Sequence, residues 1–207
     1  AANVISANTR DGVLIWDSDQ NEVIGNLIGT DVTGTADLGN LWSGVTAASG
    51  ASQNLFHQNV ISGNGDGVEF AYSGTDDNVV TANHIGLDVS GNHLLGNDSW
   101  GISIWGGASN NHIGGNSAAD GNVIAGNGGD GVRITDATSR SNVIFGNRIF
   151  DNLGLGINLI PPSGVTANDP QDRDTGANSL QNFPVLISAV SSVDTRIQGW
   201  LNSAPNT

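Results

Sequence analysis

The chain of 207 residues contains neither cysteine nor lysine, and aromatic residues make up only 5% of it. Without cysteine, the protein has no disulfides and no thiolate ligands for a metal. Six arginines stand against eighteen aspartates and two glutamates, so the net charge is −14. No basic stripe is available to release the counterions of a phosphate backbone, which argues against nucleic acid as a partner. No stretch approaches the ~20 apolar residues of a membrane-spanning helix, so no membrane insertion is expected.

Hydrophobic residues make up 37% of the chain, which is little for a globular core. The length fits one domain or one elongated array. Thirty glycines and many asparagines place a turn signal every few residues. This composition suits a narrow solenoid that is filled by stacked Val, Ile and Leu. The acidic surplus is typical of a solvated outer shell that keeps such a rod soluble.

A hexapeptide, Asn-x-Ile-x-x-Asn/Asp, recurs six times, and each copy leads into a Gly-apolar-x-apolar segment. The copies are Asn3-Ile5-Asn8, Asn26-Ile28-Asp31, Asn59-Ile61-Asn64, Asn83-Ile85-Asp88, Asn122-Ile124-Asn127 and Asn147-Ile149-Asn152. Repeats of this kind define a solenoid, because each unit buries its apolar face only by stacking on the next one.

The repeat resolves into three short strands for each turn. In the first strand, the inward pairs are Val13/Ile15, Val45/Ala47, Val68/Phe70, Ile102/Ile104, Val132/Ile134 and Ile157/Leu159. The second strand starts at an asparagine, with its inward residue two positions later, and the third is the Asn-x-Ile segment. Three strands with turn residues at the corners predict an all-β fold, a parallel β-helix of about six coils.

Asparagines form three columns at the corners of the predicted coils. One column begins the second strand, another begins the third strand, and a third closes it. We expect the third column to contain Asn8, Asp31, Asn64, Asp88, Asn127 and Asn152. Inward-turned amides at the ~4.8 Å coil spacing predict an Asn ladder, since buried corner amides need partners.

Two corners are long and resemble each other, one after Asp31 and the other after Asp88. These arms should project from the same side, two coils apart. Together with a further insertion before Asn122, they divide residues 1–160 into the coil pairs 3–58, 59–121 and 122–160. The pattern stops at Pro161, because Pro161-Pro162 breaks strand pairing. Residues 161–207 then read as an acidic loop plus β-strands, forming a cap or the start of a following domain.

The segment at 59–64, Asn-Val-Ile-Ser-Gly-Asn, with the Gly-Val-x-Ile strands and the Ile-Gly-x-Asp-x-x-Gly arms, resembles a known family. It is similar to right-handed parallel β-helix repeat proteins of the pectate-lyase-like superfamily, in the Asn-rich form seen in bacterial surface proteins. The resemblance covers residues 3–160. It implies a right-handed coil, and a superfamily that includes lyases, hydrolases, epimerases, tailspikes and adhesins. The Gly-His-Gly segment of polygalacturonase-like members is absent, and Tyr72 is followed by Ser73 rather than by an epimerase motif.

The outward residues of the first strand provide the best candidate site. Glu69 and Arg133 lie two coils apart, about 10 Å, and bracket Ser103 beside Trp105. Asp66 and Asp130, at nearby corners, are candidates for the second carboxyl group that glycoside hydrolysis needs. Four of the five tryptophans, Trp16, Trp42, Trp100 and Trp105, flank this face. Their indoles could form a carbohydrate-binding platform, or they could cover the edge of the solenoid and anchor the arms.

A second candidate site lies after the repeats. Asp169, Asp172, Asp174 and Asn178 place oxygen ligands at close intervals around Gly176. Ca²⁺ takes six to eight oxygens, so the spacing predicts a calcium site, although the closing Glu of an EF-hand is missing. Calcium is not required by any other feature of the sequence.

These observations predict a secreted or cell-surface β-helix module that is non-catalytic and contacts polysaccharide or cell-surface glycan. The alternatives are a polysaccharide lyase or glycoside hydrolase acting on the first-strand face, and a purely structural spacer. Because a β-helix without caps exposes strand edges, and residue 1 almost coincides with the first repeat, we also expect end-to-end self-association or a flanking domain.

Overall fold

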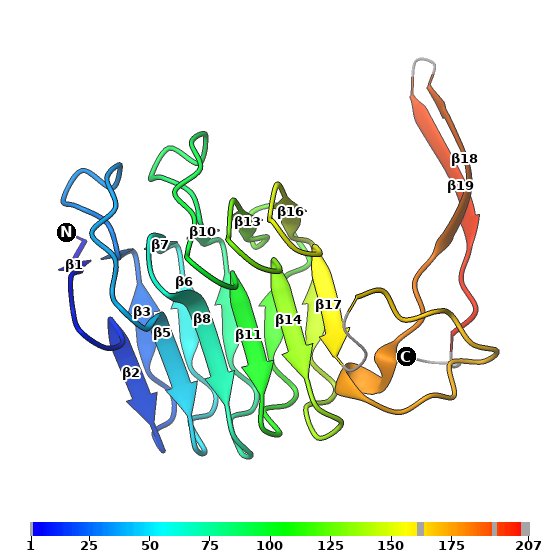
Figure 1. The fold of residues 1–207 in the computed structure, drawn as a ribbon, viewed down its shortest axis with the longest axis horizontal. Coiled ribbons are helices and arrows are strands. Elements are labelled where there is room, and N and C mark those ends of the chain that lie inside the picture. The colour runs from blue at the N-terminus through cyan, green and yellow to red at the C-terminus, as the bar shows by residue number, and fades with distance from the viewer. Residues whose placement is uncertain (1, 161–163, 192–193, 204–207) are drawn as a thin grey trace.

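The computed structural model describes residues 2–160, 164–191 and 194–203. Short parallel strands wind into a rod with three sheets, which we call A, B and C. The first five coils contribute one strand to each sheet, and the last coil contributes β16 (Arg148–Phe150) and β17 (Ile157–Ile160) to sheets A and B (Figure 1). The prediction of an all-β parallel β-helix with a short non-repeat β segment is confirmed. No helix in the described ranges is long and apolar enough to cross a membrane.

Each sheet stacks its strands in chain order along the rod. Sheet A contains β1 (Val4–Ile5), β4 (Leu27–Ile28), β7 (Val60–Ile61), β10 (His84–Ile85), β13 (Val123–Ala125) and β16 (Arg148–Phe150). Sheet B contains β2 (Val13–Trp16), β5 (Ser43–Ala48), β8 (Asp66–Ala71), β11 (Ile102–Trp105), β14 (Val132–Thr135) and β17 (Ile157–Ile160). Sheet C contains β3 (Glu22–Ile24), β6 (Leu55–His57), β9 (Val79–Thr81), β12 (His112–Gly114) and β15 (Val143–Phe145).

Register follows the predicted inward pairs of sheet B. Val45 pairs with Val68, Val68 with Ile102, and Ile102 with Val132. In the middle coils these side chains are fully buried, and Phe56 packs on Phe70 at 5.7 Å between ring centroids. Because strands alternate, the same register places Thr46, Glu69, Ser103 and Arg133 in one outward column. The core thus fixes which side chains face solvent on sheet B.

Asparagine side chains link every coil to the next. In the middle of the rod, the main-chain N–H and Nδ2 of Asn54 both donate to Oδ1 of Asn78, at 3.0 and 2.8 Å. Asn78 makes the same two bonds to Asn111. The same pattern repeats in columns that begin at Asn3 and Asn8. Each buried amide therefore accepts a hydrogen bond from a corner N–H of the neighbouring coil. This bond offsets the free-energy cost of burying polar groups at the corners.

The third column differs from the sequence prediction at two positions. Its members are Asn8, Asn40, Asn64, Asn97, Asn127 and Asn152. Asp31 and Asp88 were expected here, but they lie inside the arms, where their carboxylates accept hydrogen bonds from the arm itself. The arm is inserted between the third strand and the corner, so the asparagine that follows the arm fills the column.

The two arms project from the same edge of the rod, as predicted (Figure 1). They touch, because Val89 N–H donates to the carbonyl of Gly34 at 2.9 Å. Gly34 has φ +70°, and a Cβ there would lie 2.8 Å from Cβ of Val89. The arms therefore form one ridge over the intervening coil.

The repeat ends at β17, and a non-repeat segment follows it. A short 3₁₀ helix, η1 (Ala177–Leu180), packs on β17 and β14. A hairpin of β18 (Val185–Ser191) and β19 (Thr195–Trp200) then projects away from the rod (Figure 1). Residues 161–163, where the Pro161-Pro162 break was expected, lie outside the described residues. The expected end-to-end association stays a prediction.

Candidate functional site

Sheet B carries a cleft of about 340 Å³ over strands β8, β11 and β14. Its lining consists of Asp66, Glu69, Trp100, Ser103, Trp105, Arg133 and Thr135. The parallel register brings together side chains that are far apart in sequence, because Glu69, Ser103 and Arg133 occupy equivalent places on three neighbouring strands. The cleft therefore joins three of the four candidate catalytic residues and two of the four tryptophans. Its volume lies at the lower end of the range for small-molecule sites.

Glu69 is held firmly in this cleft. Trp105 donates its indole N–H to Oε1 of Glu69 at 2.7 Å. On the other side, Ser43 Oγ donates to Oε2 at 3.0 Å, and Thr46 Oγ1 lies 3.4 Å from the same atom. A charge-assisted bond of 2.7 Å is a strong one. The carboxylate of Glu69 and the ring of Trp105 are thus fixed relative to each other.

Arg133 closes the opposite side of the cleft. Its guanidinium carbon lies 4.1 Å from the centroid of the Trp100 ring, in a cation–π contact. Its Nε atom is buried and has no hydrogen-bond partner among the described residues. Arg133 is the single cation among the described residues that line the cleft, and Trp100 fixes its position.

Asp66 begins β8 and lines the cleft beside Glu69. Burial raises the pKa of Asp66 to about 6, and the negative charge of Glu69 adds to this rise. The main-chain N–H of Trp100, which donates to Oδ1 at 3.3 Å, and the charge of Arg133 act in the opposite direction. At mildly acidic pH, Asp66 is thus an acid that can donate a proton.

Asp130, the other carboxyl candidate, does not line the cleft. It is only 8% exposed, and its oxygens accept hydrogen bonds from Leu155 N–H at 2.7 Å and Asn158 Nδ2 at 2.9 Å. Its position two coils beyond Asp66 suggested an equivalent role. Its carboxylate instead ties the last coil to the one before it, which is a structural task.

The four tryptophans fall into two groups, one at the carboxyl ends of the sheet B strands and the other at their amino ends. Trp16 and Trp105 are the last residues of β2 and β11, and Tyr72 lies between them. Ring centroids are 6.3 Å apart for Trp16 and Tyr72, and 4.6 Å apart for Tyr72 and Trp105, with edge-on geometry in both pairs. Trp16 is 57% exposed and Tyr72 is 43% exposed. We call these three residues the aromatic row.

The sequence prediction missed Tyr72 as a member of this row. It follows Ala71, which pairs in register with Trp105, so its place just past the end of β8 was the signal available. At the amino ends of the strands, Trp42 carries Arg10 on its ring at 4.4 Å, which repeats the arrangement of Trp100 and Arg133 two coils away. Trp42 lies outside the cleft. The row and the two Arg–Trp pairs border sheet B on both sides.

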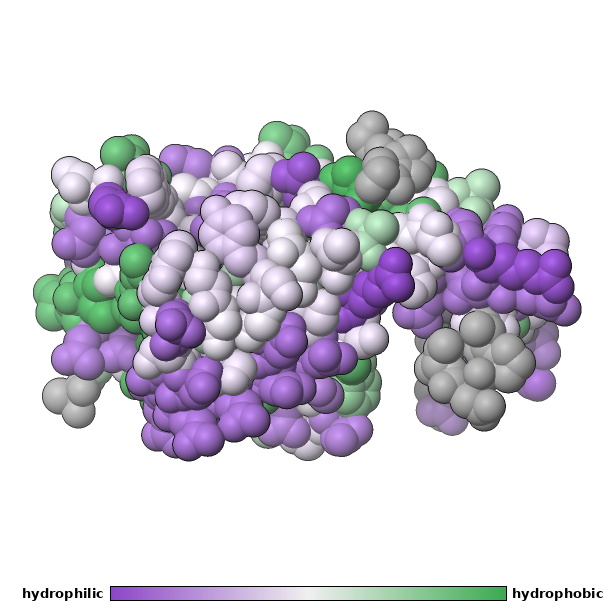
Figure 2. Space-filling view, turned by 90° about the horizontal axis from the view of Figure 1, so that it is seen from below, coloured by the Kyte–Doolittle hydropathy of each residue, from purple (hydrophilic) through white to green (hydrophobic). Residues whose placement is uncertain are grey.

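Seen from below, the rod shows a surface that is near-white to purple over its middle, with green hydrophobic areas at the margins (Figure 2). The carboxyl ends of the sheet B strands point downward in Figure 1 and so face the viewer in Figure 2. The middle of the rod, as far as its residues are described, shows no broad hydrophobic patch in this view.

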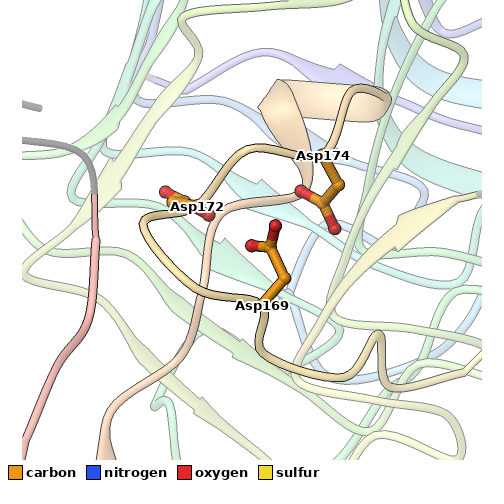
Figure 3. Close-up of side chains that lie close together, drawn as sticks. All are labelled: Asp169, Asp172 and Asp174. Carbon is orange, nitrogen blue, oxygen red and sulfur yellow. The ribbon is translucent and has the colours of Figure 1, made fainter.

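The acidic loop after the repeats brings three of its four candidate ligands together. Oxygens of Asp169, Asp172 and Asp174 lie within 4.8 Å of one another, with the carboxylates gathered beside η1 (Figure 3). Burial, and then the charges of Asp169 and Asp172, raise the pKa of Asp174. The three side chains provide a set of hard oxygen ligands of the kind that Ca²⁺ takes.

Asn178 does not join this set. Its Oδ1 accepts from Asn142 N–H at 2.7 Å, and its Nδ2 donates to the Asn142 carbonyl at 3.0 Å. Asn178, although it belongs to the non-repeat segment, adds one more residue to the column that runs from Asn21 through Asn78 to Asn142. Its role is to satisfy the open corner of the last coil, so the prediction that it holds a metal is not supported by its contacts.

No protein-family model matches the chain, and no curated protein matches its sequence. Among solved structures, the chain is similar to the periplasmic alginate epimerase AlgG, solved as a point mutant, with a TM-score of 0.58 and 19% identity. The similarity covers 75% of this chain and 31% of that one, so the chain spans about a third of the similar protein. The likeness establishes the architecture that the sequence predicted, which is a right-handed parallel β-helix.

Proposed function

We propose that this chain is a non-catalytic module of an exported or cell-surface protein, and that it binds glycan on sheet B. The observation that carries the proposal is the cleft in which Glu69, fixed by Trp105, faces Arg133, fixed by Trp100. Aromatic faces stack on sugar rings, and fixed carboxylate and guanidinium groups orient hydroxyls. The similar structure is that of a periplasmic alginate epimerase, which supports both a carbohydrate ligand and export.

Retention of the chain in native gels that contain polysaccharide tests this proposal. We expect Trp105→Ala to reduce retention, because it removes both the ring and the N–H that holds Glu69. Trp200→Ala is the control, since Trp200 is also an indole, is more exposed than Trp105, and lies on the hairpin, away from sheet B. Equal retention of both variants, or no retention of the parent chain on any glycan, would contradict glycan binding on sheet B.

A second candidate function is glycan cleavage, and Asp66 favours it. This carboxyl shares the cleft with Glu69, and its raised pKa suits a general acid. Two features favour binding instead. Asp66 and Glu69 come from one strand only three residues apart, and both oxygens of Glu69 already accept hydrogen bonds. In glycosidases the two carboxyls instead flank the scissile bond.

New reducing ends after incubation with neutral and acidic polysaccharides, with and without calcium, distinguish the two functions. Binding alone produces no reducing ends on any polysaccharide. A signal that is lost in Glu69→Gln or Asp66→Asn would assign catalysis to the cleft. Arg133→Ala completes the set, because a lyase mechanism would depend on its charge.

A further inference from the structure

We propose that the sheet B cleft takes an uncharged glycan chain, laid parallel to the axis of the rod, and rejects polyuronates. This inference rests on the proposed function, and it specifies the class and direction of the ligand. It follows from two features of the same face, namely the local balance of charge and the path of the aromatic row.

Charge in the cleft is the first feature. Asp66 and Glu69 provide two carboxyls, and Arg133 is the only cation among the lining residues. Just beyond the cleft, Asp11 accepts from Thr46 at 2.8 Å, which adds another carboxylate to this face. Arg10, which also borders sheet B, is stacked on Trp42. A run of uronates would bring several like charges against this surface at close range.

Arg133 does not reverse this balance. Its Nε is buried, which leaves only the two terminal amino groups to meet a ligand carboxylate, and this one cation stands against the two carboxyls of the cleft lining. Its charge already acts on Asp66, lowering the pKa of that carboxyl against the effect of burial. In 0.15 M salt, charges are screened beyond ~8 Å, so the local groups decide the outcome more than the net charge of the chain.

The aromatic row is the second feature. Trp16, Tyr72 and Trp105 come from the first, third and fourth coils and contact one another in sequence. Trp16 and Trp105 occupy register positions three coils apart, or ~14 Å along the rod. The row starts at the cleft, where Trp105 contacts Glu69, and leads toward the first coil. A linear glycan that enters the cleft is therefore guided along the axis rather than across the strands.

The first experiment compares an uncharged linear glucan with a polyuronate of similar length in affinity electrophoresis. We expect at least a tenfold higher affinity for the glucan, and polyuronate retention that rises as salt screens the repulsion. Glu69→Gln should increase polyuronate retention several-fold. Polyuronate retention that equals or exceeds that of the glucan, and weakens with salt, would overturn the charge inference but leave glycan binding standing. Failure to retain either glycan would instead contradict the proposed function.

The second experiment tests the direction with glucan oligosaccharides of increasing length, measured by calorimetry. Trp105→Ala should weaken short and long oligosaccharides alike, because this ring borders the cleft. Trp16→Ala should weaken only the long ones, since its ring lies at the far end of the row. A Trp16→Ala effect that is independent of length, or absent at every length, would exclude binding along the axis.

Discussion

Trp105 donates its indole N–H to Glu69 across two adjacent strands of sheet B, at 2.7 Å. The bond joins the aromatic row to the charged floor of the cleft. It also shows how a solenoid builds a site, because residues 36 positions apart become neighbours when one coil stacks on the next.

Removing this hydrogen bond while keeping a ring should cost stability. Trp105→Phe leaves a ring beside Tyr72 but deletes the donor to Glu69, so we expect the free energy of unfolding to fall by about 1–2 kcal/mol. Trp16→Phe is the matched control, because the Trp16 ring also contacts Tyr72, and its side chain makes no hydrogen bond within the described residues. Urea unfolding of both variants measures the difference, and equal losses would show that the N–H contributes nothing.

The asparagine columns should be most sensitive in the middle of the rod. Asn78→Ala strands two donors of Asn54 and also removes the donor to the Ala51 carbonyl, all buried. We expect a loss of about 3–5 kcal/mol in unfolding free energy. Asn21→Ala, in the first coil, removes one donor and strands no neighbouring one, so about 1 kcal/mol is expected. Similar losses in thermal or urea unfolding would contradict the buried-amide account.

Asp66 should make the folded state less stable as the pH rises from about 4 to about 6. Burial raises its folded-state pKa to about 6, from 3.8. Between these values, the native state holds the proton that the unfolded state has lost, so raising the pH favours unfolding. After allowance for solvent screening, the contribution is on the order of 1 kcal/mol.

Asp66→Asn cannot titrate and should lack this contribution. The comparison of both proteins by urea unfolding at several pH values isolates it from other carboxyls. Asp31, for example, has a pKa lowered to about 2, first by the hydroxyl of Thr33, and its stabilising contribution is lost only as the pH falls from about 4 to about 2. Parallel curves for the two proteins above pH 4 would contradict the raised pKa.

Calcium, if it binds the loop of Asp169, Asp172 and Asp174, should stabilise the segment beside η1. We expect millimolar Ca²⁺ to slow amide exchange in residues 169–182, and EDTA to reverse the effect. Asp174→Asn should slow amide exchange in this segment when calcium is absent and speed it when calcium is present. It relieves repulsion among three acids when calcium is absent, and it removes a ligand when calcium is present. Exchange that does not respond to calcium would contradict the predicted site.

Much of the rod could be read from the sequence, because inward pairs such as Val68/Phe70 and Ile102/Ile104 carry both the strand period and the register. The same alternation predicts that Glu69, Ser103 and Arg133 lie in one column, which the strand register confirms. The strand period does not predict which residue fills a corner position, however. Asp31 and Asn64 occupy the same place in the hexapeptide, yet only Asn64 lies in a column, since an arm intervenes after Asp31.

The details of the site depended on side-chain direction, which alternation does not supply at strand ends. Tyr72 follows its strand at φ +70°, so the two-residue period no longer says where its ring points. Asp66 and Asp130 each lie two residues before the first inward residue of their coil, Val68 and Val132, but Asp130 is bonded to Leu155 and Asn158 of the last coil. Asn178 fills a column from outside the repeat, and no repeat-based pattern could identify it.

The position of Asn40 and Asn97 behind the arms has a consequence for how this chain can vary. Each arm leaves the rod after a sheet A strand and returns at an asparagine that takes the next place in the column, so the coil closes as if the arm were absent. Loop closure cost rises only slowly with loop length. This corner is therefore a permissive insertion point. Foreign peptides of different lengths can be inserted and displayed there without changes to the sequence of the coils beneath them.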